Sequence, residues 1–143
     1  MSVSVVGRHE GGLRFRMEQD GHTFMLDGAR EFGGVDAGPR PKNLLLSSLI
    51  GCTGMDVASI LKKMKVRDYK LEITADGKYN DEHPVHFVDI HLTFSFHGTD
   101  LPRKKVDHAV ELSQEKYCGV TYMLGKAADL TYSVEYHEEQ DES

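Results

Sequence analysis

The sequence predicts a single α+β domain, with short strands grouped at both ends of the chain and helices between them. Apolar and polar residues alternate in the stretches 3–27 and 69–97, as they do in half-buried strands. The apolar segment 44–61 is too long for a strand and fits a helix. Strand and helix do not alternate regularly along the chain, which argues against a parallel, doubly wound sheet.

Length and composition place further bounds on the protein. With 143 residues, 39% of them hydrophobic, the chain can bury a core without disulfides. We expect one domain over residues 1–143, with a flexible acidic tail at 137–143. The net charge of −6 and a longest basic run of only Arg103-Lys104-Lys105 argue against nucleic-acid binding, because phosphate contacts need clustered cations. The N-terminus lacks an apolar segment after a basic start, so we expect a cytoplasmic protein.

The N-terminal residues predict an antiparallel meander. Residues 3–5 and 13–17 alternate apolar and polar side chains, which is typical of strands. Asp20-Gly21 forms a typical hairpin turn before a third strand at 22–27. These three strands would form one small sheet.

A loop and a long helix follow the meander. The stretch 33–41 is rich in glycine and proline and cannot hold regular structure, whereas Pro41 suits the first turn of a helix. We expect the helix to run from about Pro41 to Lys65. Its first two thirds are apolar on nearly every face, which predicts a central helix covered on all sides. The polar residues within 44–61 favour a soluble core over a membrane.

Strands and helices then alternate less regularly. We expect strands at 69–79 and 86–97, the second with one apolar face formed by Val88, Ile90, Leu92, Phe94 and Phe96. An amphipathic helix is expected to start after Asp100 and to end before Gly119, and a shorter helix to cover 120–128. A last strand over 130–136 completes the order β-β-β-α-β-β-α-α-β.

Two cysteines, Cys52 and Cys118, are the candidate reactive groups. Cysteines in a cytoplasmic chain are more often free or redox-active than structural disulfides. A thiolate that attacks a peroxide becomes a sulfenic acid, which needs a second thiol to avoid overoxidation, and this pair would supply both sulfurs. The helix break at Cys118 would place its sulfur near the first amides of the next helix, which favours a thiolate. Simple core packing of Cys52 is the alternative.

Two kinds of neighbour bear on these thiols. Asp56, one turn beyond Cys52, would disfavour the thiolate if it lay close, or would accept hydrogen bonds from a helix surface. Tyr117 and Tyr122 flank the second cysteine and would line an apolar pocket or pack in the core.

Cofactors and metals are not expected. The closest histidines lack the spacing of a zinc site: His83, His86 and His91. Gly33-Gly34 lacks the context of a phosphate-binding loop, so no nucleotide cofactor is indicated.

Three stretches point to a known family. Gly33-Gly34 is followed by Pro41, Cys52 lies in LLLSSLIGCTGMDVASILKKM, and Cys118 lies in SQEKYCGVTYMLGKAADLTYSVEY. These motifs resemble the OsmC/Ohr superfamily, in particular its YhfA-like branch, over residues 7–136. The resemblance implies an OsmC-like fold in which antiparallel sheets wrap around two central helices of an intertwined homodimer. It also implies a thiol peroxidase that reduces organic hydroperoxides.

The resemblance assigns roles to three residues. Cys52 matches the peroxidatic cysteine and Cys118 the resolving cysteine. Gly7-Arg8 resembles a Gly-Arg turn whose arginine faces the reactive sulfur, so Arg8 is the candidate for stabilising the thiolate; a solvated charge at the end of a strand is the other interpretation.

The chain departs from the pattern of related peroxidases at two places. Those proteins carry Glu directly after the helix-opening proline, where this chain has Lys42 and Asn43, and Pro after the second cysteine, where it has Gly119. The carboxylate that would hold the arginine is therefore open among Glu31, Asp36 and Glu115.

Together these features predict a homodimeric, antioxidant thiol peroxidase. It would reduce a small hydroperoxide through a Cys52 sulfenate and a Cys52–Cys118 disulfide, which an external dithiol would reduce. A non-catalytic protein that binds a small ligand in the same pocket is one alternative. A redox-sensing interaction protein is another.

Overall fold

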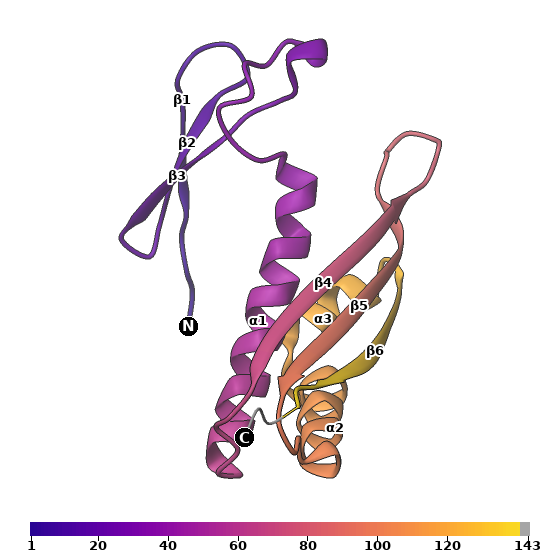
Figure 1. The fold of residues 1–143 in the computed structure, drawn as a ribbon. Coiled ribbons are helices and arrows are strands. Elements are labelled where there is room, and N and C mark those ends of the chain that lie inside the picture. The colour runs from indigo at the N-terminus through magenta and orange to yellow at the C-terminus, as the bar shows by residue number, and fades with distance from the viewer. Residues whose placement is uncertain (141–143) are drawn as a thin grey trace. The chain divides into compact units, whose positions relative to one another are not determined.

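The computed structural model describes residues 1–140 and divides the chain into two compact units, Met1–Leu45 and the residues from Leu46 onward. Figure 1 labels the strands β1–β6 and the helices α1–α3. The helices and strands follow the predicted order and are β1 (Val6–His9), β2 (Phe15–Gln19), β3 (His22–Leu26), η1 (Arg30–Phe32), α1 (Pro41–Lys63), β4 (Lys70–Tyr79), β5 (Phe87–Gly98), α2 (Arg103–Leu112), η2 (Ser113–Tyr117), α3 (Gly119–Gly125) and β6 (Asp129–Glu138).

The first unit contains the predicted antiparallel meander, β1-β2-β3. Asp20 and Gly21 both have positive φ, 52° and 78°, as the central residues of a tight hairpin turn require. The prediction for the first strand is wrong in position, because β1 begins at Val6 and leaves Val3 and Val5 outside the ladder.

The predicted Gly7-Arg8 turn is also wrong. Gly7 pairs with Met17 and Arg8 with Arg16 inside the β1–β2 ladder. The hairpin turn lies further along the chain at Gly11 and Gly12, whose φ values of 102° and 55° suit glycine and allow the reversal there.

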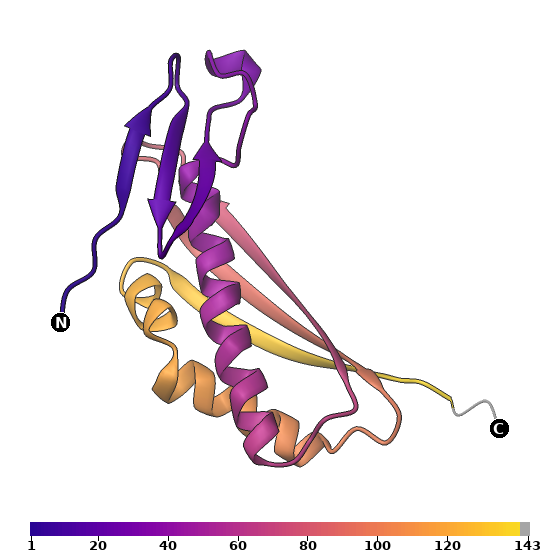
Figure 2. The same ribbon diagram turned by 90° about the vertical axis from the view of Figure 1, so that its left-hand side faces the viewer.

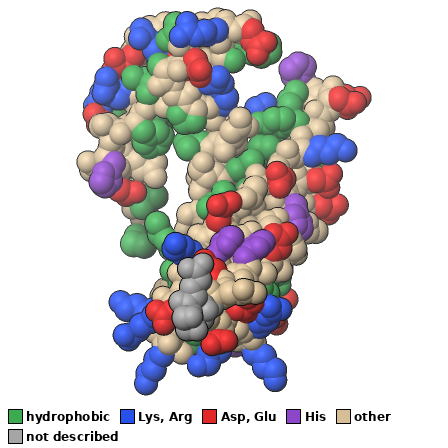
Figure 3. All heavy atoms as spheres, viewed as in Figure 1, with side chains coloured by type: hydrophobic (Ala, Val, Ile, Leu, Met, Phe, Trp, Pro, Cys, Tyr) green, Lys and Arg blue, Asp and Glu red, His purple; other side chains and the backbone are tan. Residues whose placement is uncertain are grey.

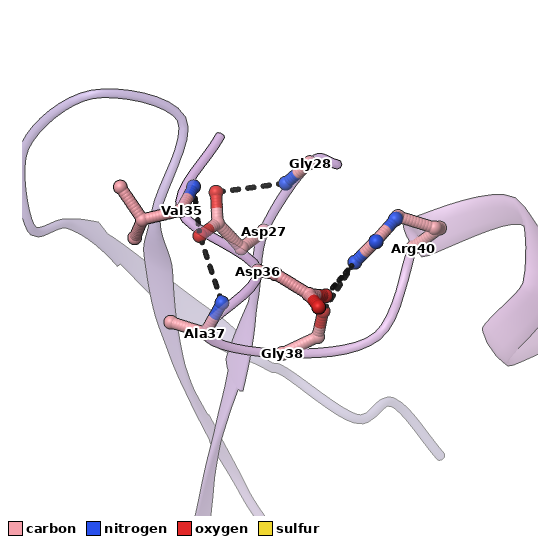
Figure 4. A network of polar contacts seen from close by, with 7 residues as sticks. All are labelled: Asp27, Gly28, Val35, Asp36, Ala37, Gly38 and Arg40. Atoms are coloured by element: carbon pink, nitrogen blue, oxygen red, sulfur yellow. Dashed lines mark hydrogen bonds and ion pairs between the residues drawn. The ribbon is translucent and has the colours of Figure 1, made fainter. Parts of the chain in front are cut away.

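A buried carboxylate organises the loop after β3, as Figure 4 shows. Asp27 is 2% exposed and accepts hydrogen bonds from the backbone N–H groups of Gly28 (2.7 Å), Val35 (3.0 Å) and Ala37 (3.0 Å). These bonds, the one from Ala37 first, hold the pKa of Asp27 below its ordinary value. The predicted loop is thus confirmed, and this side chain orders it.

The second unit contains a sheet in the order β4-β5-β6. β4 and β5 are antiparallel, but β5 and β6 are parallel, which corrects the prediction of antiparallel sheets. The physical reason is the connection: the chain between β5 and β6 passes through α2, η2 and α3, and such a helical crossover returns the chain in the original direction.

The core lies on one face of this sheet. Four of the five residues predicted for the apolar face of β5 are buried, Ile90, Leu92, Phe94 and Phe96, whereas Val88 is only partly buried and its neighbour Phe87 is buried instead. They share one hydrophobic cluster with buried residues of α1 and α2, so both helices cover the same face, and Figure 2 shows α1 running along the sheet. On the opposite face, where Figure 3 shows histidine side chains grouped, His97 stacks on His137 with ring centroids 4.4 Å apart.

The prediction that α1 is covered on all sides is wrong for the single chain. Its fully buried residues form one stripe at intervals of four: Leu49, Thr53, Val57 and Leu61. Met55, on another face, is 76% exposed. A helix buried on one stripe has further apolar surface available for a second protein surface. The second central helix of the expected dimer remains a prediction.

By length and composition α1 would be long enough to cross a membrane, since its most apolar 18-residue window has a mean hydropathy of 1.7. Of that window 22% is buried, and the buried stripe packs into the core with β5.

The C-terminal half differs from the prediction in two details. The amphipathic helix ends as a π-helical turn, η2, in which the N–H of Cys118 donates to the carbonyl of Ser113 at 2.8 Å. His137 and Glu138, predicted to begin an acidic tail, belong to β6, while residues 141–143 of that tail lie outside the described part of the chain.

Candidate active site

Cys52 lies on α1, directly before the buried residue Thr53. Its side chain is partly exposed and packs against the edge of the hydrophobic core. The apolar stripe of α1 fixes the rotation of the helix, because Leu49 and Thr53 must face the core. That rotation leaves Cys52, the residue before Thr53, at the border between core and surface.

Cys118 lies where η2 ends and α3 begins. It is 4% exposed and caps α3, since its sulfur accepts a hydrogen bond of 3.3 Å from the N–H of Thr121. The sequence-based expectation that this sulfur lies near the first amides of the next helix is met in the structure.

The two sulfurs converge. The Sγ atoms of Cys52 and Cys118 and a carboxylate oxygen of Asp56 all lie within 4.8 Å of one another. Both thiols are free. The structure therefore brings together the two cysteines singled out in the sequence, which stand on different elements, and adds Asp56 to them.

Polar side chains missed in the sequence surround the buried sulfur. The Thr53 hydroxyl lies 3.2 Å from the Cys118 sulfur, and Gln114 Nε2 donates to the same hydroxyl oxygen at 3.1 Å. Gln114 Oε1 in turn accepts from the hydroxyl of Thr121 at 3.4 Å. The sequence did contain a signal for Thr53, because this polar residue interrupts the apolar run next to Cys52. Gln114 and Thr121 could not have been identified without the fold.

The pKa values of the two thiols are shifted in opposite directions. Burial alone would raise the pKa of Cys118, but hydrogen bonds from Thr121, Thr53 and Cys52 outweigh it, and the pKa lies below its ordinary value. Burial raises the pKa of Cys52, and the neighbouring Cys118 and Asp56 raise it further against a lowering bond from the Val120 backbone. Of the two thiols, Cys118 is therefore the one that ionises more readily.

Asp56 has a partner that the sequence did not identify. Ser113 donates its hydroxyl to Oδ2 of Asp56 at 3.3 Å. Asp56 also lines a surface pocket of about 410 Å³ together with Ile60, Lys63, Leu112 and Tyr117.

The two tyrosines beside Cys118 do not pack in the core. Tyr117 is 53% exposed and lines this pocket, and Tyr122 is also exposed. Of the two alternatives for these side chains, the pocket is thus the one that holds for Tyr117.

Arg8 lies in the first unit, on β1, and is exposed. Its guanidinium contacts the Glu18 carboxylate at 2.7 Å, and the hydrogen bond that it donates to this carboxylate raises the pKa of Arg8. Glu18 is thus its carboxylate partner within the chain, rather than Glu31, Asp36 or Glu115. The role of Arg8 beside the reactive sulfur stays a prediction.

Comparisons with known proteins agree with this fold. The model of the family described as OsmC-like protein matches residues 33–133. The protein YhfA from Escherichia coli is 38% identical over 125 residues, which are 87% of this chain and 90% of YhfA. The single domain over residues 1–143 stays a prediction.

Solved structures give the same result. A hypothetical protein from Aquifex aeolicus has a TM-score of 0.80 and 26% identity, covering 96% of this chain and 99% of its own. The organic hydroperoxide resistance protein OhrB of Bacillus subtilis has a TM-score of 0.63 and 20% identity, covering 94% of this chain and 98% of its own, a likeness of fold alone.

Proposed function

The chain belongs to the OsmC-like protein family, and from this premise we propose that it is a thiol-dependent peroxidase for organic hydroperoxides. The family includes organic hydroperoxide resistance proteins, which supports a peroxide-related redox role. The observation that carries the proposal is the convergence of two thiols, with pKa values shifted in opposite directions, next to Asp56, which lines a surface pocket.

In the first step Cys52 is the nucleophile, because its sulfur is the more exposed one. The Cys118 thiolate takes the Cys52 proton, and the resulting Cys52 thiolate attacks the terminal oxygen of the hydroperoxide. The O–O bond breaks, Cys52 becomes a sulfenic acid, and the departing alkoxide takes the proton back from Cys118 to leave as an alcohol.

In the second step the Cys118 thiolate attacks the Cys52 sulfenic sulfur. An S–S bond forms and hydroxide leaves, which becomes water on protonation. Sulfurs that already lie within 4.8 Å need only side-chain rotation and small backbone shifts to approach bonding distance. An external dithiol then reduces the disulfide and restores both thiols. Thus neither a cofactor nor a metal takes part in this cycle.

The test is peroxide consumption by three proteins: the parent, Cys52→Ser and Cys118→Ser. We expect no reaction from Cys52→Ser, and from Cys118→Ser a slow single turnover that leaves a sulfenic acid on Cys52, detected by dimedone labelling and mass spectrometry. Sulfenic acid on Cys118 in the Cys52→Ser protein would reverse the two roles. Unchanged turnover in both variants would refute the proposal.

The proposal includes a homodimer. Leu45 and Met55 of α1 and Phe15 of β2 are exposed in the single chain, and a second copy would cover such apolar surface. In this dimer a second α1 forms the pair of central helices, and an Arg8 faces Cys52 and stabilises its thiolate. Light scattering after gel filtration tests it: the parent should have twice the chain mass, and Met55→Glu should shift it toward the monomer.

A second candidate is a non-catalytic protein that binds a small ligand in the same pocket. The raised pKa of Cys52 favours this candidate, because a protonated thiol is a weak nucleophile. The rate of Cys52 alkylation against pH separates the two functions. If the alkylation rate of the assembled protein gives an ordinary or raised pKa for Cys52, ligand binding is favoured. If it gives a lowered pKa, catalysis is favoured.

Redox sensing is distinguished by its partner. A sensor of this kind would capture another protein only in its disulfide form, whereas a peroxidase needs only substrate and a dithiol. We also propose that the protein is cytoplasmic, where its thiols would stay reduced, and that it has no membrane partner and, given its net charge of −6, no nucleic-acid partner.

A further inference from the structure

We propose that the reduced side chains of Cys52, Cys118 and Asp56 bind a thiophilic divalent cation such as Zn²⁺. The two sulfurs and a carboxylate oxygen lie within 4.8 Å of one another, each from a residue type that binds zinc. This inference concerns ion binding by the resting dithiol, and it holds whether or not the protein is a peroxidase.

The ligand set suits such an ion in number and chemistry. Zinc takes thiolate sulfur at about 2.3 Å and carboxylate oxygen at about 2.1 Å, and three protein ligands leave one tetrahedral position for water or a small molecule. Side-chain rotations that move each ligand atom by about 1 Å would bring the three atoms to these distances. Thiolate ligands select thiophilic ions over Mg²⁺ or Ca²⁺.

Hydrogen bonds already orient two of the three ligands. Ser113 donates to Oδ2 of Asp56 at 3.3 Å, and the N–H of Thr121 donates to the Cys118 sulfur at 3.3 Å. Such contacts to the ligands hold them in place and increase metal affinity. Because the partners come from η2 and α3, the site is built by three elements and not by one helix alone.

An ion can reach the site from solvent. Asp56 lines the pocket of about 410 Å³ and Cys52 is partly exposed, while Cys118 is buried. Lys63 lines the same pocket, so a cation would be held here by bonds to its ligands and not by a general negative field.

Oxidation would release the ion, a consequence that rests on the proposed function. The zinc dithiolate, one organic hydroperoxide and two protons yield the disulfide, one alcohol, one water and free Zn²⁺, so that atoms and charge balance. The disulfide sulfurs no longer carry the negative charge that binds zinc. Bound zinc and hydroperoxide would therefore compete for the same electron pairs.

Cadmium chloride titration of the reduced full-length protein, without oxygen and without peroxide, tests the binding. We expect a thiolate-to-cadmium charge-transfer band in the ultraviolet that saturates at one ion per chain. Cys52→Ser and Cys118→Ser should each weaken the band. Asp56→Asn should keep the band but weaken the affinity by about tenfold or more, and Ser113→Ala by about tenfold.

Asp76→Asn is the matched control, since Asp76 is an exposed carboxylate on β4 and should leave the affinity unchanged. Circular dichroism verifies that each variant is folded. If Asp56→Asn does not fold, the affinity of Ser113→Ala serves as the test of the carboxylate ligand. Absence of the band in the reduced parent would overturn the inference, as would parental affinity in both Asp56→Asn and Ser113→Ala. A band that persists in the disulfide form would also overturn it. Cadmium binding without peroxidase activity would leave it standing.

Discussion

The two units of the chain are stabilised in opposite ways. In the second unit the buried side chains are mainly hydrophobic and form one cluster from α1, β5 and α2. In residues 1–45 the one buried residue is Asp27, a carboxylate that gathers backbone N–H groups. Apolar side chains of this first unit, such as Phe15 and Phe32, are exposed. One unit is thus ordered by packing, which also positions the thiols, and the other by hydrogen bonds around a charge.

The strongest way to break the second unit is to empty its core. Phe94 is fully buried on β5, so Phe94→Ala should lower the free energy of unfolding by about 3–5 kcal/mol through lost burial and a cavity. Urea denaturation followed by circular dichroism measures the change. Phe32→Ala is the control from the first unit, where a ring that is 79% exposed should cost no more than about 0.5 kcal/mol. Equal costs for the two variants would contradict the comparison.

The first unit should be most sensitive to a side chain that clashes with the backbone of its loop. A Cβ at Gly34 would lie 2.0 Å from the carbonyl oxygen of Gly28, and a backbone atom cannot rotate away as a side chain can. Gly34→Ala should therefore destabilise the loop by about 1–3 kcal/mol and speed hydrogen exchange at Val35 and Ala37. Gly21→Asn, where a Cβ meets open space and Asn tolerates positive φ, should leave these amides protected. Unchanged exchange in Gly34→Ala would show that the loop has another support.

A smaller effect is expected at the buried hydroxyl of the active site. Thr53→Val keeps the shape but removes the group that contacts the Cys118 sulfur and Gln114, which should cost about 1 kcal/mol and raise the pKa of Cys118. Thiolate absorbance against pH, in a Cys52→Ser background, measures the pKa. Thr74→Val on the exposed side of β4 is the control. An unaltered Cys118 titration would remove Thr53 from the account of the thiol.

The smallest and most local effect concerns acid. Because backbone hydrogen bonds lower the pKa of Asp27 in the folded state, its ionised form stabilises the loop above the ordinary pKa of about 3.9. That stabilisation is lost as the pH falls through the lowered folded pKa. The Val35 and Ala37 amides should therefore lose protection from exchange in this acidic range before those of β5. NMR at stepwise lower pH measures both sets, and simultaneous loss would argue against a separate polar centre.

The features that could be predicted best from the sequence are those that side-chain packing determines. The alternation in β5 identified its buried face, because a shift of one residue would turn every apolar side chain outward. β1 was misplaced for the converse reason, since all four of its residues are exposed and no buried face fixes its ends. The direction of β6 depends on the crossover between distant elements, which its own residues do not encode.

The site was predicted in its thiols but not in their surroundings. Cys52 and Cys118 stood out by residue type, whereas Ser113 and Gln114 become neighbours of α1 only through tertiary packing. The Arg8–Glu18 pair follows from register, since Glu18 lies diagonally from Arg8 across the β1–β2 ladder. That register could not be assigned while the first strand was misplaced.

The wide turn before Cys118 has a geometrical consequence. Residues five apart on an α-helix point about 140° away from each other, at 3.6 residues per turn. In η2 the hydrogen bond from Cys118 N–H to the Ser113 carbonyl spans five residues, so that both side chains face Thr53. The Ser113 hydroxyl donates to the Thr53 carbonyl at 3.5 Å, and the Cys118 sulfur lies 3.2 Å from the Thr53 hydroxyl. If the same residues were wound as a regular α-helix, the Cys118 sulfur would turn about the helix axis, away from Cys52. The reactivity of Cys118 thus depends on the width of this turn as well as on the residue type.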